Sequence, residues 1–328
     1  MAGRQPVKVG ILGAGAIAAK MAGTLARMDE AVPYAVASRD IAKAKAFAGA
    51  HGVEKAFGGY EEMLADPALE LVYVATPNTF HHAHAKLCLE GGKHVLLEKP
   101  FTVDAREAED LVALASSRGL LLAEAMWTRY LPFMQTIRRL LDDGIVGTVL
   151  TLNANIGNDV KDRQRLYDPA LGGGTLLDLS VYTLNFALMT MGGDVERVAS
   201  SFVRYRTGVD SQNGMVVSFA SGRMATLFAT MLSATDKRAV FYGDKGWLAV
   251  ENLNNPVSAR VFAADGTPGE TFTRPEQISG FEYQVASAVD AIRNGRTECP
   301  EMPHAETLRV MRILDSVREE WGMRSQPR

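Results

Sequence analysis

The chain has 328 residues, a formal net charge of -3, and 47% hydrophobic against 22% charged residues. This length is sufficient for two domains with separate cores, and the charge gives no basic footprint for nucleic acid or an anionic membrane surface. No uncharged apolar run approaches the ~20 residues of a bilayer span. We therefore expect no nucleic-acid partner and no membrane contact. The two cysteines, Cys88 and Cys299, form no metal or redox pattern, which favours a reducing, cytoplasmic setting.

The first predicted strand, VKVGIL at residues 7–12, is followed by the glycine-rich run 13–18 and then by a helix to about Met28. Gly13 permits a tight turn, Gly15 lets the backbone approach a pyrophosphate, and Ala18 keeps the helix close to the sheet. The first amides of the helix can then bind an anion. The alternative is a plain strand-to-helix turn. The residues that we assign here to cofactor binding are Gly10, Gly13, Gly15, Ala16 and Ile17.

Strand and helix patterns alternate over the rest of the first third of the chain. Further strands are expected at 34–38, 71–76, 94–98 and 120–125, and helices at 41–50, 80–90 and 105–117. Near-continuous apolar strands separated by helices predict a parallel sheet covered on both faces. With right-handed crossovers, residues 1–125 then form a doubly wound Rossmann domain, of class α/β.

In such a sheet, ligands bind at the carboxyl ends of the strands. Polar, cationic and turn-forming residues follow several of these predicted strands, which makes this edge the expected site. Besides the glycine turn, the residues that we assign there to cofactor binding are Ser38, Arg39, Lys43, Thr76, Asn78, His81, Glu98, Lys99 and Trp127.

The end of the second strand indicates which cofactor is bound. An acidic residue there would hold a ribose 2′-hydroxyl, but the strand ends in Ser38 and Arg39, with Lys43 one helical turn beyond. Cations and a hydroxyl suit a 2′-phosphate, so NADP is favoured over NAD. Asp40 is expected to cap the following helix rather than to bind ribose. The alternative is that Arg39 and Lys43 belong to a solvated helix start.

Lys99 is the first catalytic candidate, because Pro100 ends its strand and holds the lysine extended at the sheet edge. The nearby histidines His81, His82 and His84 do not form a metal site, since only His81 and His84 share a helix face and no further ligand completes a set. We therefore expect no metal.

From residue 126 the pattern changes to strands separated by turns, expected at 149–156, 195–205, 214–220, 224–232, 238–243, 247–251 and 259–264. Helices are expected at 134–141 and 304–321, the latter with a core stripe at Val310, Ile313, Leu314, Val317 and Trp321. Residues 126–328 are predicted to form an α+β substrate and oligomerisation domain with a large, mainly antiparallel open sheet. Such a sheet can pair between subunits, so a homodimer or higher homo-oligomer is expected.

One helix of this domain follows Gly172, Gly173 and Gly174, which would let a flat ring approach the backbone. Asp178 and Tyr182 lie four residues apart on it and share one helix face. A carboxylate in this apolar run is expensive to bury unless it is paired. For Tyr182 taken alone, core packing is the simpler interpretation.

The chain resembles the Gfo/Idh/MocA oxidoreductases over nearly its full length. The matching residues are VGILGAGAIA (9–18), ATPNTFH (75–81), GGKHVLLEKP (91–100) and the glycine-initiated helix up to Tyr182. The segments 37–40, 124–130 and 165–169 resemble the branch of dimeric dihydrodiol dehydrogenases and NADP-dependent D-xylose dehydrogenases. The resemblance implies that Lys99 and Tyr182 are the catalytic pair, that Asp178 supports them, and that Trp127 lines the substrate pocket. Tyrosine replaces the family's common histidine at 182, which argues against inositol-type dehydrogenation.

The implied activity is hydride transfer between nicotinamide and a secondary alcohol, or its ketone, in a sugar, polyol or trans-dihydrodiol. Tyr182 would take or give the hydroxyl proton, with its phenol pKa lowered from about 10 by the Lys99 ammonium. The alternatives are a nucleotide-sugar 3-ketoreductase, a redox-neutral hydrolase or lyase with tightly held NAD, and a non-catalytic NADP-sensing regulator.

Overall fold

The computed structural model describes residues 5–323, and its contacts divide the chain into two units. The first unit contains Met1–Tyr130 together with Gln277–Met311, and the second contains Leu131–Glu276 together with Arg312–Arg328. The division into domains of residues 1–125 and 126–328 stays a prediction. By its contacts, however, a late segment of the chain is part of the first unit.

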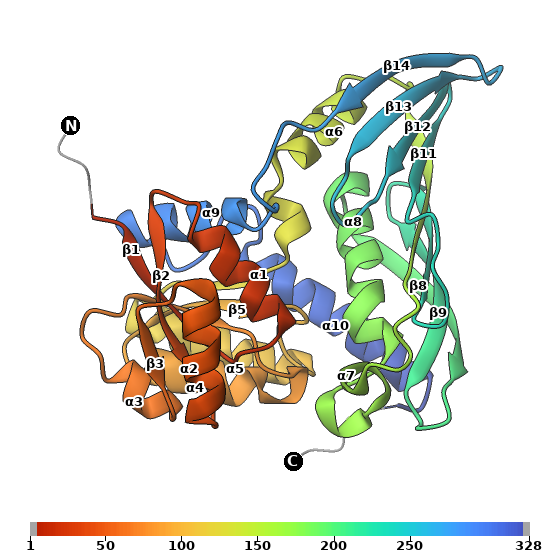
Figure 1. The fold of residues 1–328 in the computed structure, drawn as a ribbon. Helices are drawn as coiled ribbons and strands as arrows, with labels where there is room; N and C mark the ends of the chain where they lie inside the picture. The colour runs from red at the N-terminus through yellow and green to blue at the C-terminus, as the bar shows by residue number, and fades with distance from the viewer. Residues whose placement is uncertain (1–4, 324–328) are drawn as a thin grey trace. The chain divides into compact units, whose positions relative to one another are not determined.

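The first unit is built on a six-stranded sheet in the order β3-β2-β1-β4-β5-β6. All of its strand pairs are parallel, and the order reverses between β1 and β4 (Figure 1). This is the doubly wound Rossmann arrangement, so the fold expected for the first domain is confirmed. The strands are β1 (Val7–Leu12), β2 (Ala31–Ala37), β3 (Lys55–Phe57), β4 (Leu71–Val74), β5 (His94–Glu98) and β6 (Leu122–Ala125).

Helices cover both faces of this sheet, as Figure 1 shows. The late segment contributes α9, which contacts β2 and β5, and the beginning of α10. We did not predict β3, α3 or α9 from the sequence. The helices are α1 (Ala16–Leu25), α2 (Ile41–His51), α3 (Tyr60–Leu64), α4 (His81–Glu90), α5 (Ala105–Arg118), α9 (Glu282–Arg293) and α10 (His304–Glu320), with short 3-10 turns η1 (Asn78–Phe80) and η2 (Trp127–Tyr130).

Side chains at the helix ends explain where α2 and α5 begin. The Asp40 carboxylate accepts hydrogen bonds from the backbone amides of Ala42 and Lys43, and Asp104 accepts from Glu107. These bonds satisfy amides that have no partner inside the helix. The interpretation of Asp40 as a cap is confirmed.

Lys93, from the GGKHVL motif, stabilises the amino-terminal edge of the sheet. Its ammonium is buried and donates to the carbonyl oxygens of Asp66 at 2.8 Å and Leu69 at 2.9 Å. A buried cation must be paired or hydrogen-bonded, and these carbonyls meet that need. The lysine of this motif is therefore structural and lies at the sheet edge opposite the strand ends.

The second unit contains an eight-stranded sheet in the order β14-β13-β12-β11-β7-β10-β9-β8. Its strand pairs are antiparallel except for β7 and β10, which are parallel. The predicted mainly antiparallel sheet is confirmed, with β14 as an additional strand. The strands are β7 (Val149–Gly157), β8 (Val195–Arg204), β9 (Asp210–Phe219), β10 (Met224–Thr230), β11 (Ala239–Gly243), β12 (Gly246–Glu251), β13 (Ser258–Ala263) and β14 (Pro268–Thr273).

Helix α8 (Val181–Met191) packs against β7 and β10 and covers one face of this sheet (Figure 1). It continues directly from a π turn, η4 (Leu176–Ser180). The unit also contains α6 (Pro132–Asp142), α7 (Gln164–Tyr167), the turn η3 (Pro169–Leu171) and the end of α10. Of the predicted stripe, Val310, Leu314 and Val317 in α10 and Trp321 just after it are buried, whereas Ile313 is only half-buried.

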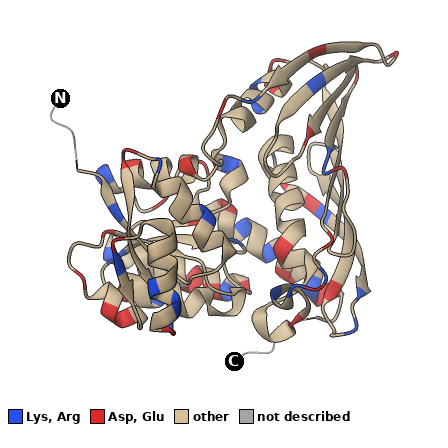
Figure 2. Cartoon of the chain, in the orientation of Figure 1, with Lys and Arg blue, Asp and Glu red and all other residues tan. Residues whose placement is uncertain are grey.

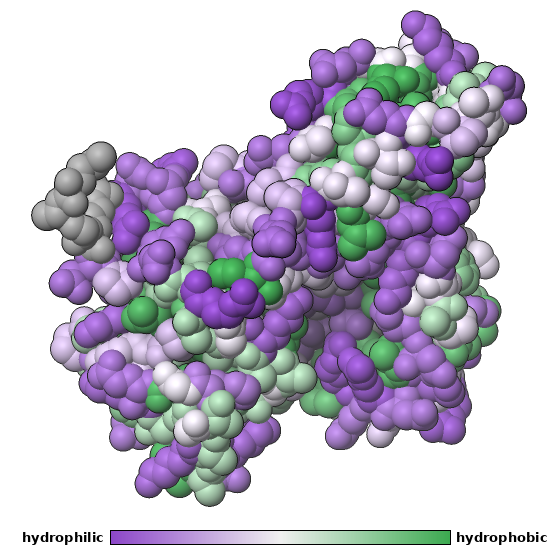
Figure 3. All heavy atoms as spheres, turned by 45° about the horizontal axis from the view of Figure 1, so that its top comes forward, coloured by the Kyte–Doolittle hydropathy of each residue, from purple (hydrophilic) through white to green (hydrophobic). Residues whose placement is uncertain are grey.

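The opposite face of the sheet carries large apolar side chains that are exposed, among them Val216, Met224, Phe228 and Tyr242. Cross-strand register places these four on one face, because Val216 pairs with Thr226, and Met224 and Tyr242 both pair with Thr151. Figure 3 shows apolar atoms gathered within a mainly polar surface at the upper right, on the second unit.

Acidic and basic residues are interspersed along both units (Figure 2). Within residues 5–323, no helix combines the length and apolar character needed to cross a bilayer.

Candidate active site

The carboxyl ends of the parallel strands bring together Gly13, Ser38, Thr76, Lys99 and Trp127 at one edge of the first unit. Backbone bonds join the three central ends, since Gly13 N–H donates to the carbonyl of Ala37 and Ala75 N–H donates to that of Leu12. The crevice of a doubly wound sheet lies where the strand order reverses, here between β1 and β4. The edge predicted from the sequence is therefore a real convergence of side chains.

The glycine turn after β1 has the geometry that anion binding requires. Gly13 has φ 108°, and a Cβ there would lie 2.8 Å from the Ala75 carbonyl oxygen, so glycine is required. Gly15 is the N-cap of α1 without a side-chain cap, and Gly15, Ala16 and Ile17 are exposed. The first amides of α1 therefore point to open space, which fits a pyrophosphate.

Gly10 has a different role in the same motif. It is buried within β1, and a Cβ there would lie 2.8 Å from a methyl carbon of Leu69. Its lack of a side chain is explained by packing inside the first unit.

The end of β2 presents the cations expected for a 2′-phosphate. Arg39 and Lys43 are both exposed, and the Arg39 guanidinium lies 6.0 Å from the centre of the Phe80 ring. The Ser38 hydroxyl accepts a long, 3.4 Å hydrogen bond from the Asp40 amide. Two cations and a hydroxyl at the end of this strand fit the phosphate that distinguishes NADP from NAD.

His81 is buried and bridges two strand ends. Its Nδ1 lies 2.8 Å from the Pro100 carbonyl oxygen, and its Nε2 lies 2.9 Å from that of Thr76. Burial lowers the pKa of His81, so the imidazole is neutral and can donate to only one of the two carbonyls. These contacts place it beneath the cofactor edge, where it links the segment after β4 to the segment after β5.

His84 lies one helical turn from His81 on α4. It stacks on Phe80 with ring centres 5.6 Å apart, and its Nδ1 lies 3.0 Å from the Thr76 hydroxyl oxygen. Burial lowers the pKa of His84 to about 4, with smaller contributions from His81 and Arg39. Asn78, in η1 before this helix, is half-buried. His81 and His84 thus shape the edge with neutral rings.

Lys99 follows β5 and is half-buried, and its peptide bond to Pro100 is cis. The preceding Glu98 is buried, accepts from the Tyr73 hydroxyl, and receives the Lys99 amide at 3.1 Å. These bonds fix the backbone from which the Lys99 side chain extends.

Trp127 begins η2, directly after β6, and is only 7% exposed. Its ring lies edge-on to Phe281 at 5.1 Å, and the Lys20 ammonium lies 4.2 Å from the centre of the Trp127 ring and 4.0 Å from that of Phe281. A Cβ at Gly280 would lie 2.8 Å from the indole. The tryptophan is therefore held by α1 and by the late segment, through packing and a cation–π contact.

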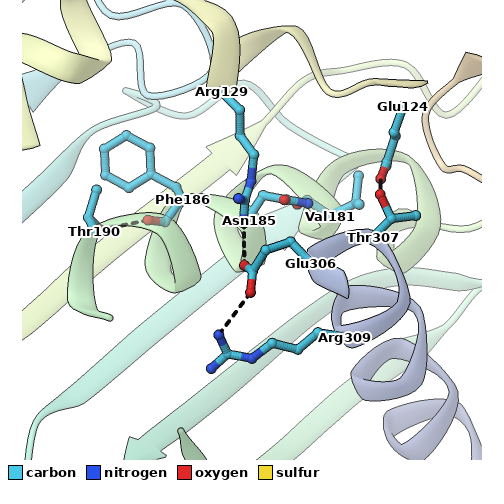
Figure 4. A network of polar contacts seen from close by, with 9 residues as sticks. All are labelled: Glu124, Arg129, Val181, Asn185, Phe186, Thr190, Glu306, Thr307 and Arg309. Carbon is cyan, nitrogen blue, oxygen red and sulfur yellow. Dashed lines mark hydrogen bonds and ion pairs between the residues drawn. The ribbon is translucent and has the colours of Figure 1, made fainter. Parts of the chain in front are cut away.

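Glu124, in β6, is fully buried beside this edge. Its carboxylate accepts a 2.8 Å hydrogen bond from the hydroxyl of Thr307, in α10. Nearby, Arg129 forms a 2.8 Å ion pair with Glu306, also in α10 (Figure 4). Burial raises the pKa of Glu124 to about 7, against the smaller effects of Thr307 and Arg129. These polar contacts anchor the beginning of α10 to the first unit.

In the second unit, Asp178 is buried and paired, as a carboxylate in an apolar helix requires. The Arg165 guanidinium donates to its two oxygens at 2.6 and 3.4 Å. Arg165 lies in α7, in the segment before the three glycines. Sequence reasoning expected a partner for Asp178 but did not name this arginine.

Asp178 and Tyr182 both lie on the helix that begins after the glycines, and Tyr182 is half-buried. Asp178 is inside the π turn and Tyr182 follows in α8, so their spacing does not follow a regular α-helix. This corrects our expectation of a uniform α-helical face across positions 178 and 182. The sequence carries no simple signal for such a turn.

The glycines before this helix are explained by the chain's own packing. A Cβ at Gly173 would lie 2.5 Å from the Leu166 carbonyl oxygen, and Gly174 has φ 118° with its Cβ position 2.3 Å from an Asp210 carboxylate oxygen. Protein atoms thus explain why glycine is needed at these two positions, and our expectation of a ligand ring against the backbone stays a prediction.

The candidate residues thus fall into two groups, a cofactor edge with Lys99 in the first unit and the Asp178–Tyr182 helix in the second. The pairing of Lys99 with Tyr182 stays a prediction. Sequence reasoning missed Lys20, Glu124 and Asp210. The charged residues Lys20 and Asp210 stand in otherwise ordinary segments, and only their partners, distant in the chain, reveal them.

Family models match most of the chain. Residues 7–126 match an oxidoreductase family described as having an NAD-binding Rossmann fold, and residues 134–249 match the Gfo/Idh/MocA C-terminal domain. The chain belongs to the Gfo/Idh/MocA oxidoreductase family. The resemblance inferred from the motifs is confirmed.

Individual relatives span nearly the whole chain. A trans-1,2-dihydrobenzene-1,2-diol dehydrogenase from Sus scrofa is 34% identical over 325 residues, which cover 96% of both proteins. A 3-ketoreductase from Actinomadura kijaniata, solved in complex with NADP and TDP-benzene, is 29% identical with a TM-score of 0.88, covering 96% of this chain and 97% of that one. An aldose-aldose oxidoreductase from Caulobacter crescentus has a TM-score of 0.87 at 23% identity, and this shows likeness of fold alone.

Proposed function

We propose that this protein is an NADP-dependent dehydrogenase that acts on a secondary alcohol of a sugar, polyol or trans-dihydrodiol. The observation that carries the proposal is the near full-length similarity to dihydrodiol dehydrogenases, in a chain whose β2 is followed directly by Ser38 and Arg39. The open glycine turn and the two exposed cations at this edge support the cofactor. NADP, when bound, supplies the hydride acceptor or donor.

The chain's own residues bind the cofactor, orient the reacting groups and transfer the proton. The amides at the start of α1 bind the pyrophosphate, and Arg39 with Lys43 binds the 2′-phosphate. Tyr182 takes the alcohol proton at its phenolic oxygen during oxidation and returns it during reduction. Lys99 stabilises the phenolate, Asp178 orients the reacting groups, and Trp127 lines the substrate pocket.

The test is an absorbance screen for reduced nicotinamide, with NADP and NAD, across pentoses, hexoses, polyols and trans-dihydrodiols. We expect NADPH to form with at least one alcohol and to be released into solution. If only nucleotide-linked keto sugars are turned over, the substrate class is nucleotide sugars, and the protein is a ketoreductase of the alternative kind. NADP binding without turnover on any of these compounds would refute a dehydrogenase.

Arg39→Ala should raise the KM for NADP by roughly 10–100-fold, because charge-assisted hydrogen bonds contribute about 1.5–3 kcal/mol each. The KM for NAD should change by less than about twofold, since NAD lacks the phosphate that Arg39 would bind. Lys45→Ala, which removes an exposed lysine of the following helix α2, is the control. An equal rise in KM for both cofactors would show that Arg39 does not bind the 2′-phosphate.

A second copy of this chain is the partner that we propose for the exposed face of the eight-stranded sheet. Large apolar side chains on one sheet face, opposite the face covered by α8, are typical of an interaction surface. Light scattering after gel filtration should give twice the mass of the chain. Phe228→Lys should reduce this to one chain with the circular dichroism unchanged, whereas a monomeric wild-type protein would refute the dimer.

A further inference from the structure

The helix that carries Asp178 and Tyr182 is held at its beginning by a buried carboxylate from the sheet. Asp210, the first residue of β9, accepts a 2.8 Å hydrogen bond from the Leu176 amide, at the start of the π turn. The same carboxylate oxygen accepts a 2.8 Å bond from the side-chain amide of Asn213. Asn213 in turn accepts a 2.8 Å bond from the hydroxyl of Ser180, the last residue of the π turn. Asp210 and Asn213 therefore hydrogen-bond to the two ends of η4, at Leu176 and Ser180.

These three side chains are all buried, with Asp210 4%, Asn213 3% and Ser180 0% exposed. Burial raises the pKa of Asp210 to about 6, opposed by the bonds from Asn213 and the Leu176 amide and by Arg318 of α10. A buried carboxylate is destabilising compared with an apolar residue of similar size. The hydrogen bonds from the Leu176 amide and the Asn213 side chain offset part of this penalty and hold the carboxylate in a defined position.

The glycine before the helix belongs to the same arrangement. A Cβ at position 174 would lie 2.3 Å from an Asp210 carboxylate oxygen, so the carboxylate occupies the place of the missing side chain. Because Gly174 has no side chain, the Asp210 carboxylate can reach the Leu176 amide at the start of the helix.

The π turn decides how Asp178 and Tyr182 are directed relative to each other. A π turn contains one residue more than an α turn, and such turns are frequent at functional sites. If η4 relaxed to an α turn, residues before and after it would rotate relative to one another by about 100°, the angle of one α-helical residue. Asp178 lies inside the turn and Tyr182 beyond it. A change in the turn therefore changes the direction of the carboxylate relative to the phenol.

We propose that Asp210 is a positioning residue for hydride transfer, because its hydrogen bond to the Leu176 amide holds the π turn and so sets the directions of Asp178 and Tyr182. The proposal rests on the proposed function, in which these two side chains serve the reaction. Asp210 touches neither substrate nor cofactor and acts through the helix.

The experiment compares the full-length wild-type protein with Asp210→Ala and Asp210→Asn. In Asp210→Ala the Leu176 amide loses its acceptor, and we expect kcat to fall by about a hundredfold, the effect of roughly 1 Å of misplacement. The KM for NADP should stay within about twofold, since the cofactor residues lie on other elements. Asparagine keeps a side-chain oxygen for the Leu176 amide, so Asp210→Asn should recover kcat to within about tenfold of wild type.

The matched control is Thr190→Ala, which removes a 2.6 Å hydrogen bond to the Phe186 carbonyl near the far end of the same helix (Figure 4). We expect it to leave kcat unchanged. Wild-type kcat in Asp210→Ala, or an equal loss in Thr190→Ala, would overturn the proposal.

Amide hydrogen exchange at Leu176 gives a readout that needs no turnover. Exchange should accelerate by at least about tenfold in Asp210→Ala and stay at the wild-type rate in Thr190→Ala, because opening of a local hydrogen bond sets this rate. If Asp210→Ala fails to fold, Asp210→Asn decides, since faster Leu176 exchange there with wild-type kcat would refute the link. A wild-type protein without turnover on any substrate would refute the proposed function. Unchanged Leu176 exchange in Asp210→Ala would instead show that Asp210 does not hold the π turn.

Discussion

Tyr182→Phe should lower kcat by about a thousandfold, within the range that general acid–base catalysis contributes. The substitution removes only the phenolic oxygen, which is the atom that we assign to proton transfer, and it retains the ring that packs in α8. NADP affinity should stay within about twofold, because binding in the ground state does not need that proton. Steady-state kinetics with the best alcohol, together with a fluorescence titration of NADPH, measure both quantities.

The control for Tyr182→Phe is Tyr205→Phe, which removes a phenolic oxygen from the tight connection between β8 and β9. We expect its kcat to equal that of wild type. If Tyr182→Phe turns over normally with cofactor binding intact, tyrosine is not the proton carrier, and Lys99 becomes the candidate for that role.

Lys99→Met should lower kcat/KM by at least about a hundredfold near neutral pH and move the rate–pH profile to higher pH. An ammonium group within ~4–6 Å lowers the pKa of a neighbouring acid by roughly one to three units, from about 10 for a free phenol. Without this cation the phenolate forms only at higher pH, so the rise in oxidation rate with pH should shift upward by about that amount. The measurement is kcat/KM for alcohol oxidation over the pH range in which the protein stays folded.

Two further variants separate charge from packing at this position. Lys99→Arg keeps a cation and should retain more activity than Lys99→Met, with a smaller shift of the profile. Lys45→Met removes an exposed lysine of α2 and should change neither quantity. A large loss in Lys99→Met without any shift of the profile would contradict the role in phenol ionisation.

The Rossmann part of the fold could be predicted because its strands are short, apolar runs that alternate with helical segments. The strand β3 escaped prediction because it has only three residues, all of them half-buried. Helix α9 was missed among the turn-rich segments that follow β14, although it packs on the first sheet. Periodicity shows which residues are buried but does not show which segments pair, so the parallel contact of β7 with β10 could not be foreseen.

The position of the candidate residues at the strand ends was predictable where they belong to a contiguous motif, as at Gly13 and Lys99. Its supporting residues were not, because they act through partners that are distant in the chain. Lys20 meets Phe281 only through folding, and Asp210 reaches Leu176 from a different strand. At Gly173 and Gly174 the pattern was noticed but its structural cause could not be foreseen, since only coordinates show that a carbonyl and a carboxylate fill the space.

The late segment 277–311 makes the nucleotide-binding half of this protein discontinuous in the gene. A fragment cut after Tyr130 would lack α9, which packs on β2 and β5, and would leave the buried Glu124 without its Thr307 donor. Exchange of the part of this chain before residue 131 at a single junction would therefore separate β2 and β5 from α9, which packs on them. A functional chimera needs a second crossover that carries this returning segment together with the strands on which it packs.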